Sequence, residues 1–198
     1  ASLEVWQAVC DLTHRDNIDS NTRLMLNQIL KHVIDVSVYG TRYLEPTEEN
    51  LLCWSEQDEE DFETLRNDVR EMVREIVRLR NQKDGAAREH VIYCLDCGRA
   101  QLQAWYEQVT PDNIGNWHYA ESWLHICTAI SKTINALTDD DAVRDETLLQ
   151  MIDSILRLFF QAPVQVRPII RTTAMLLGVL SPAVMQLQDM NLLLQCIG

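Results

Sequence analysis

Apolar residues recur at intervals of three and four along almost the whole chain, and this periodicity constrains the fold more than any other feature. Each stripe puts its apolar side chains on one helix face, which must be buried against another element. The stripes predict helices at about 2–12, 21–38, 58–80, 85–107, 116–136, 143–160, 166–180 and 183–196. Because no segment alternates convincingly as a strand does, the sequence predicts an all-α fold.

The predicted helices are separated by short segments rich in turn and capping residues. These segments are 110–116, 137–141 and 161–168, and Asp84, Asn116 and Asp140 are the expected N-caps. The helices then form four antiparallel pairs, with a repeat of about 40–50 residues, the period of HEAT-type α-solenoids. The predicted pairs are 2–38, 58–107, 115–160 and 165–198. A compact helical bundle is the alternative architecture.

The expected core follows directly from these stripes. In the helix at 58–80 the apolar face is predicted to contain Phe62, Leu65, Val69, Met72, Ile76 and Leu79. In the helix at 85–107 it contains Ala87, Val91, Cys94 or Leu95, Gly98, Leu102 and Trp105, and in the helix at 116–136 it contains Ala120, Leu124, Cys127, Ile130 and Ile134.

The net charge of −13 argues against direct binding of nucleic acid, which requires clustered Lys and Arg. An acidic surface instead favours basic proteins or peptides, although it can serve solubility alone. No apolar run reaches the roughly 18 residues of a membrane span, and no signal peptide is visible. The apolar patterns begin and stop at the ends of the chain, so we expect a fragment of a longer solenoid.

An acidic block at the start of "SEQDEEDFETLRNDVREMVREIVRLR" (55–80) supplies the candidate binding residues. From Phe62 onward the pattern predicts a helix whose start is stabilised by Asp61 and its neighbours. The charge at 56–59 exceeds what this helix start requires, so we expect an exposed acidic loop at 39–57. The predicted partner-binding residues are Trp54, Glu56, Asp58, Glu59, Glu60 and Asp61, with Asp139, Asp140 and Asp141 in a later turn.

Four arginines spaced by four, Arg66, Arg70, Arg74 and Arg78, form a second stripe on the same predicted helix. Glu63, Glu71 and Glu75 each precede one of these arginines by three residues, a spacing that stabilises helices through ion pairs. The pattern predicts an exposed outer face crossed by salt bridges.

His90, Cys94 and Cys97 have the spacing H-x3-C-x2-C, which raises the question of a zinc or redox site. A zinc knuckle normally lies on a tight turn, whereas these residues fall in a continuous helical pattern. His118, His125 and Cys127 are the available fourth ligands, but buried, reduced thiols are the simpler interpretation. No catalytic or phosphate-binding motif is present, so we expect neither an enzyme nor a cofactor.

Four segments, in order along the chain, carry a family resemblance: "LEVWQAVCDL" (3–12), "DEEDFETLRNDVREMVREIV" (58–77), "NWHYAESWLHICTAISKTI" (116–134) and "VQVRPIIRTTAMLLGVLSPAV" (164–184). They resemble the importin-β (karyopherin-β) superfamily and its transportin-SR and importin-thirteen-like branch. Ser122 departs from the Ala usual in the branch, and the segment 39–57 has its own composition.

The resemblance implies a middle HEAT-repeat segment of a nuclear transport receptor that shuttles between cytoplasm and nucleus. It implies binding of a basic or Arg/Ser-rich protein cargo, control by Ran GTPase, and contact with nucleoporins in the full-length protein. It also implies that the second helix of each pair lines an inner, concave side. The alternative is a helical-repeat scaffold or adaptor with no role in transport.

Overall fold

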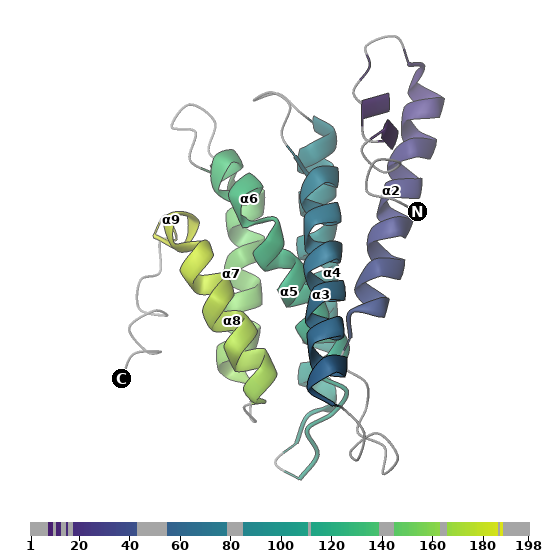
Figure 1. Ribbon diagram of the computed structural model, residues 1–198. Coiled ribbons are helices and arrows are strands. Elements are labelled where there is room, and N and C mark those ends of the chain that lie inside the picture. The colour runs from purple at the N-terminus through teal and green to yellow at the C-terminus, as the bar shows by residue number, and fades with distance from the viewer. Residues whose placement is uncertain are drawn as a thin grey trace. The chain divides into compact units, whose positions relative to one another are not determined.

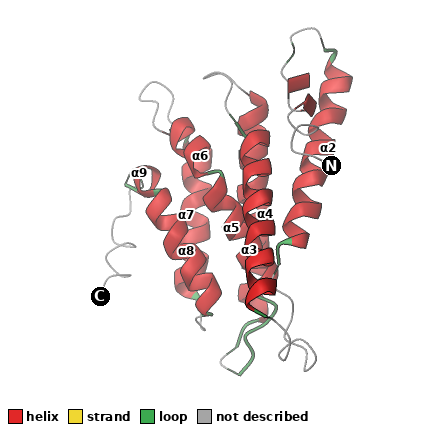
Figure 2. Cartoon of the chain, in the orientation of Figure 1, coloured by secondary structure: helices red, strands yellow, loops and turns green. Residues whose placement is uncertain are grey.

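The computed structural model describes residues 8–9, 11–12, 15, 18–42, 55–78, 85–110, 112–138, 145–162, 166–185 and 187. Across these residues the structure is helical, with no strand and one isolated bridge between Thr110 and Asn113 (Figure 1, Figure 2). The all-α prediction is therefore confirmed for the described part of the chain. The chain divides into two compact units, residues 1–90 and residues 91–198.

The first unit contains α2 (Ser20–Gly40), α3 (Glu56–Ile76) and the first residues of α4 (Gly85–Gln108). The N-cap of α2 is Asp19, whose Oδ1 accepts hydrogen bonds from the backbone N–H groups of Asn21 and Thr22, each at 3.0 Å. Its buried face, formed by Asn27, Leu30, Ile34 and Val38, packs against α3. The prediction of a helix at 21–38 is thus confirmed to within two residues at each end.

Helix α3 buries a face that differs from the predicted one by about one residue. Val69 and Ile76 are buried as expected, but Leu65 is 45% exposed and Met72 is only half-buried. Arg66, expected on the exposed face, is instead 2% exposed, and its Nη1 lies 3.5 Å from the buried carbonyl of Thr41. Packing against α2 therefore selects the face, and Arg66 tolerates burial because its guanidinium reaches a backbone acceptor.

The second unit contains the rest of α4 and α5 (His118–Ala129), α6 (Ser131–Thr138), α7 (Glu146–Gln161), α8 (Arg167–Val179) and α9 (Ser181–Val184). Helix α5 is buried along nearly its whole length and packs most extensively against α8. The predicted core residues of α4 and α5, including Leu102, Trp105 and Leu124, are buried. Helical periodicity therefore identified this core correctly.

Several predicted helix boundaries are wrong in the second unit. The single helix expected at 116–136 is interrupted at Ile130, and the helix that follows begins at Ser131. Asn116 is not the N-cap of α5, because that position is held by Trp117, whose ring stacks on His118 at 4.0 Å. Helix α8 ends at Val179, because Pro182 has no backbone N–H with which to continue its hydrogen-bond ladder.

The turn between α4 and α5 lies in the predicted turn segment at 110–116. Gly115 has a φ of 62°, a left-handed conformation that glycine adopts without a steric penalty. The indole N–H of Trp105 donates to the carbonyl of Ile114 at 2.8 Å, and the carboxamide Oδ1 of Asn113 accepts from the backbone N–H of Gly115 at 2.9 Å. These bonds hold the chain in the reversal that leads to α5.

Candidate partner-binding surface

The acidic block opens helix α3 and does not form a loop. The helix begins at Glu56, so Glu56, Asp58 and Glu59 lie in its first turn, and the predicted acidic loop at 39–57 is wrong at its C-terminal end. Helix α2 also continues to Gly40 at the other end. The sequence interpretation placed the helix start at about residue 58 and assigned the charge at 56–59 to a loop, because it overlooked Ser55 as an N-cap.

Ser55 and Asp58 form a capping box, which explains why the helix starts there. The backbone N–H of Asp58 donates to Ser55 Oγ at 3.2 Å, and the backbone N–H of Ser55 donates to Asp58 Oδ2 at 2.8 Å. The Ser55 hydroxyl also donates to Asp58 Oδ2 at 2.7 Å. These hydrogen bonds, first from the side chain and then from the backbone of Ser55, lower the pKa of the Asp58 carboxyl.

A second carboxylate of the block, that of Asp61, is engaged on the same side of the helix. Its Oδ1 accepts a hydrogen bond from the side-chain amide of Gln57 at 2.9 Å. At about 100° per residue, Asp58 and Asp61 lie on one side of α3. Both aspartates therefore serve the local structure of the helix start, as the sequence analysis expected for Asp61 but not for Asp58.

The glutamates of the block lie on a different side of the helix. Glu56, Glu59, Glu60 and Glu63 follow the spacing i, i+3, i+4 and i+7, which places them in one row. All four are exposed. We call these four residues the glutamate row; Glu63 belongs to it although the sequence analysis assigned it to an ion pair. The spacing of these glutamates by three and four residues is visible in the sequence and could have identified the row.

The other predicted binding residues have different outcomes. Trp54, Asp139, Asp140 and Asp141 lie outside the described residues, as does the expected N-cap Asp84. The expectation that Asp140 is an N-cap is wrong, because Asp145 holds that position in α7, where its Oδ1 accepts from the backbone N–H of Leu148 at 3.3 Å. Of the predicted ion pairs along α3, Arg74 with Glu71 and Arg78 with Glu75 are present, the latter at 3.4 Å. Salt bridges thus lie along α3 toward its C-terminal end.

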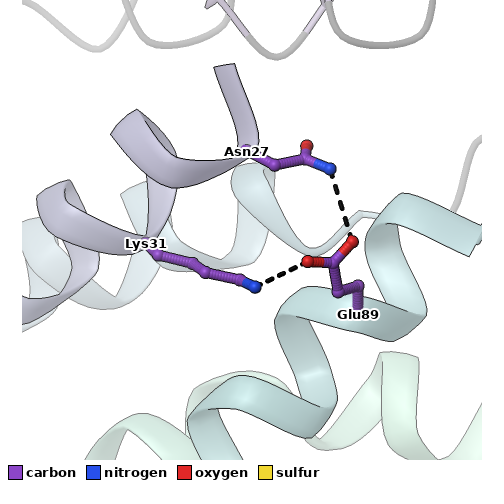
Figure 3. Close-up of polar contacts among 3 residues, drawn as sticks. All are labelled: Asn27, Lys31 and Glu89. Atoms are coloured by element: carbon purple, nitrogen blue, oxygen red, sulfur yellow. Dashed lines mark hydrogen bonds and ion pairs between the residues drawn. The ribbon is translucent and has the colours of Figure 1, made fainter. Parts of the chain in front are cut away.

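A separate polar cluster joins α2 to the first residues of α4 within the first unit (Figure 3). Lys31 Nζ lies 2.6 Å from Glu89 Oε1, and Asn27 Nδ2 donates to Glu89 Oε2 at 3.4 Å. His90 follows Glu89 and is 1% exposed. Burial lowers the pKa of His90 more than the opposing influence of the Glu89 carboxylate raises it. The imidazole is therefore neutral at physiological pH.

The candidate metal or redox residues form a buried thiol cluster. Cys94 and Cys127 are buried and Cys97 is half-buried, as the simpler interpretation predicts. The Cys127 thiol lies 3.8 Å from the carbonyl of Cys94, and burial raises its pKa to about 12. Within the described residues, no group of three His, Cys, Asp or Glu side chains is arranged to hold a metal ion.

Helix α5 carries polar residues on one face and apolar residues on the other, although both faces are buried. Glu121 faces α8, where Thr172 donates to it at 2.7 Å. On the opposite face Cys127 contacts α4, and Trp123 makes an edge-to-face contact with Tyr93 at 6.3 Å. The sequence analysis did not single out Glu121 and so missed this buried position.

No protein-family model, curated protein or solved structure matches this chain. In the described ranges, no helix is both long and apolar enough to cross a membrane.

Proposed function

We propose that this chain is a protein-binding segment of a HEAT-type helical-repeat solenoid and that it recognises a basic partner. The contact between α5 and α8 is the observation that carries the proposal. These are the first helices of two successive predicted pairs, and in a stacked-pair solenoid each pair packs on its neighbour.

The order of two hydrogen bonds supports the same arrangement. Thr172, near the middle of α8, donates to Glu121 in α5, and the side-chain amide of Asn135 in α6 donates to the carbonyl of Val179 at the end of α8, at 2.8 Å. From the first hydrogen bond to the second, the residue number rises on both sides, from 121 to 135 and from 172 to 179. Parallel first helices require this order. In the first unit, Lys31 and Glu89 similarly join the second helices of two successive predicted pairs.

The glutamate row is the surface that we assign to the basic partner. It presents four exposed carboxylates in one line, on a chain of net charge −13. Such a row attracts clustered Arg or Lys and speeds encounter with them. Asp58 is excluded from this surface because it completes the capping box.

Binding of an Arg/Ser-rich peptide to the whole chain tests the assignment. We expect the triple variant Glu56→Lys, Glu59→Lys, Glu60→Lys to weaken binding at about 0.15 M salt, where exposed charges more than about 8 Å apart are largely screened. The matched control, Asp68→Lys, Glu107→Lys, Asp112→Lys, changes the net charge equally at exposed positions elsewhere. Equal affinity of the two variants would show that the row is not the site.

The importin-β resemblance makes the proposal more specific: a nuclear transport receptor that carries cargo under the control of Ran. A pull-down of the full-length parent protein with GTP-locked and GDP-bound Ran tests this. Binding only to the GTP-locked form supports a transport receptor. Binding of the basic peptide without any nucleotide-dependent binding of Ran would support the alternative, a scaffold or adaptor with no transport role.

A further inference from the structure

Helix α2 carries a second apolar face, on the side opposite its core residues. Leu30, Ile34 and Val38 are buried, whereas four large apolar residues on the opposite side are 46–62% exposed. His32 lies among these four residues and is also exposed. We call the five residues of this face the α2 seam: Met25, Ile29, His32, Val36 and Tyr39.

The residues of the α2 seam are spaced by four, three, four and three. This is the spacing of the a and d positions of a heptad, at which one helix packs against another in a coiled coil. Ile29 and Val36 occupy a positions, and the other three residues occupy d positions. The α2 seam therefore predicts a partner helix with the same spacing.

The two ends of the α2 seam carry opposite charges. At the C-terminal end the guanidinium of Arg42 lies over the Tyr39 ring, 4.0 Å from its centre, and donates to the Tyr39 hydroxyl at 2.9 Å. At the N-terminal end the carboxylate of Asp19 accepts from the hydroxyl of Thr22 at 2.6 Å, and Thr22 holds the a position that precedes Met25. Between these ends no residue of the seam is an Asp, Glu, Lys or Arg.

These end charges determine how a second copy of α2 can pack on the seam. In a parallel pair Arg42 would meet Arg42 and Asp19 would meet Asp19, and like charges held together cost free energy. In an antiparallel pair each arginine meets the aspartate of the other copy. Because such a pair has a two-fold axis, both ends form the same favourable contact.

The heptad positions give the same register independently. In an antiparallel pair each a position packs against a d position of the other helix. The layers are then Thr22 with Tyr39, Met25 with Val36 and Ile29 with His32, each formed twice. The outermost layer joins the two residues that hold the end charges, so it brings Arg42 level with Asp19 of the other copy.

The flanks of the α2 seam fit the same arrangement. Leu26 and Val33, which are half-buried, border the seam on one side, and Gln28 and Asp35 border it on the other. In the antiparallel register Gln28 lies near Asp35 of the other copy. An amide, which can donate a hydrogen bond, therefore faces each carboxylate.

We propose that two copies of this chain associate through their α2 seams as an antiparallel helix pair with two-fold symmetry. The contact covers the exposed apolar side chains of both copies and joins Arg42 of each copy to Asp19 of the other. The inference goes beyond the proposed function, because it requires neither the glutamate row nor a basic partner.

Sedimentation velocity of the full chain over a range of concentrations tests the dimer. We expect a species with twice the chain mass of 22.9 kDa. Ile29→Lys puts a charge into both central layers and should weaken dimerisation at least about a hundredfold. The matched control Leu65→Lys changes a 45% exposed leucine on α3 and should leave the dissociation constant unchanged. A monomer at every concentration, or equal weakening by the two variants, would overturn the proposal.

Cross-linking with a short bismaleimide tests the register. When chains with Met25→Cys are mixed with chains with Val36→Cys, positions 25 and 36 should be joined between two chains. Met25→Cys alone should give no link from position 25 to position 25, because the antiparallel register separates them by about 16 Å along the helix axis. Peptide mapping by mass spectrometry distinguishes these links from those of the natural cysteines. A link from 25 to 25, or the absence of the link from 25 to 36, would overturn the proposal.

Discussion

The hydroxyl of Thr172 donates a 2.7 Å hydrogen bond to Oε1 of Glu121, and both side chains are buried between α5 and α8. Removal of this donor leaves a buried carboxylate with one hydrogen bond fewer. We expect Thr172→Val to lower the free energy of unfolding by about 1–3 kcal/mol. Urea denaturation measures the change.

Thr64→Val is the matched control for Thr172→Val. The Thr64 hydroxyl donates to the carbonyl of Glu60 at 2.8 Å, but the side chain is exposed on α3. Water replaces its hydrogen bond, so we expect a change within about 0.5 kcal/mol. Equal destabilisation by the two variants would show that the buried hydrogen bond from Thr172 to Glu121 stabilises the fold no more than an exposed one.

His90 should make the stability of the first unit depend on pH. Burial lowers its pKa in the folded state from 6.5, whereas the unfolded chain keeps the ordinary value. As the pH falls below 6.5, the unfolded state therefore takes up a proton that the folded state does not. Stability should fall with decreasing pH by at most about 1.4 kcal/mol per pH unit, until the folded-state pKa is reached.

The variant His90→Leu should remove this part of the pH dependence, since leucine does not titrate. His32→Leu, which replaces an exposed histidine of α2, provides the comparison. Urea denaturation between pH 7.0 and pH 5.0, a window of about two units around the histidine pKa, measures the slopes. An unchanged slope in His90→Leu would assign the acid sensitivity to other groups.

Two helical glycines should respond differently to substitution by alanine. A Cβ at Gly178 meets no atom within 4 Å, so Gly178→Ala should stabilise α8 by about 0.5–1 kcal/mol through backbone entropy. A Cβ at Gly98 would lie 3.2 Å from Cys127 Sγ, so Gly98→Ala should lose that gain or destabilise the protein. Thermal unfolding compares the variants.

The background Cys127→Ala separates this steric effect from helix propensity. Once the sulfur is removed, the methyl group of Gly98→Ala should fit, and the substitution should become less costly than in the parent chain. If the cost is the same in both backgrounds, the close approach of α4 and α5 at Gly98 does not determine it.

The thiols of the α4–α5 cluster should react at different rates. Burial raises the pKa of Cys127 to about 12, so almost none of its thiol is ionised at neutral pH. Cys97 is only half-buried. We expect a maleimide to modify Cys97 at least about a hundredfold faster than Cys127 under native conditions, because Cys127 requires opening of the core.

Peptide mapping by mass spectrometry resolves the two positions. In urea concentrations that unfold the chain, both cysteines should react at similar rates, which serves as the internal control. Equal native rates for Cys97 and Cys127 would contradict the burial of the second thiol.

The sequence determined the helical fold class, because apolar spacings of three and four are a local property of the chain. It also determined the core face of α4, where Ala87, Leu102 and Trp105 are buried as predicted. Along α4 the apolar residues form one unambiguous stripe, so no other face competes for burial. The position of Pro168 in the first turn of α8 was predictable for the same local reason.

Only the tertiary structure decided which face of α3 is buried. Leu65 and Arg66 are neighbours in sequence, and the contact with α2 buries the arginine and exposes the leucine. Because Ser55 caps α3, the residues from Glu56 onward are helical, and the glutamates that the sequence analysis placed in an acidic loop lie in one row on the helix. Burial of Glu121 depends on Thr172, which lies 51 residues away. Local spacing identifies helices, but the partner that each face meets depends on contacts between distant segments.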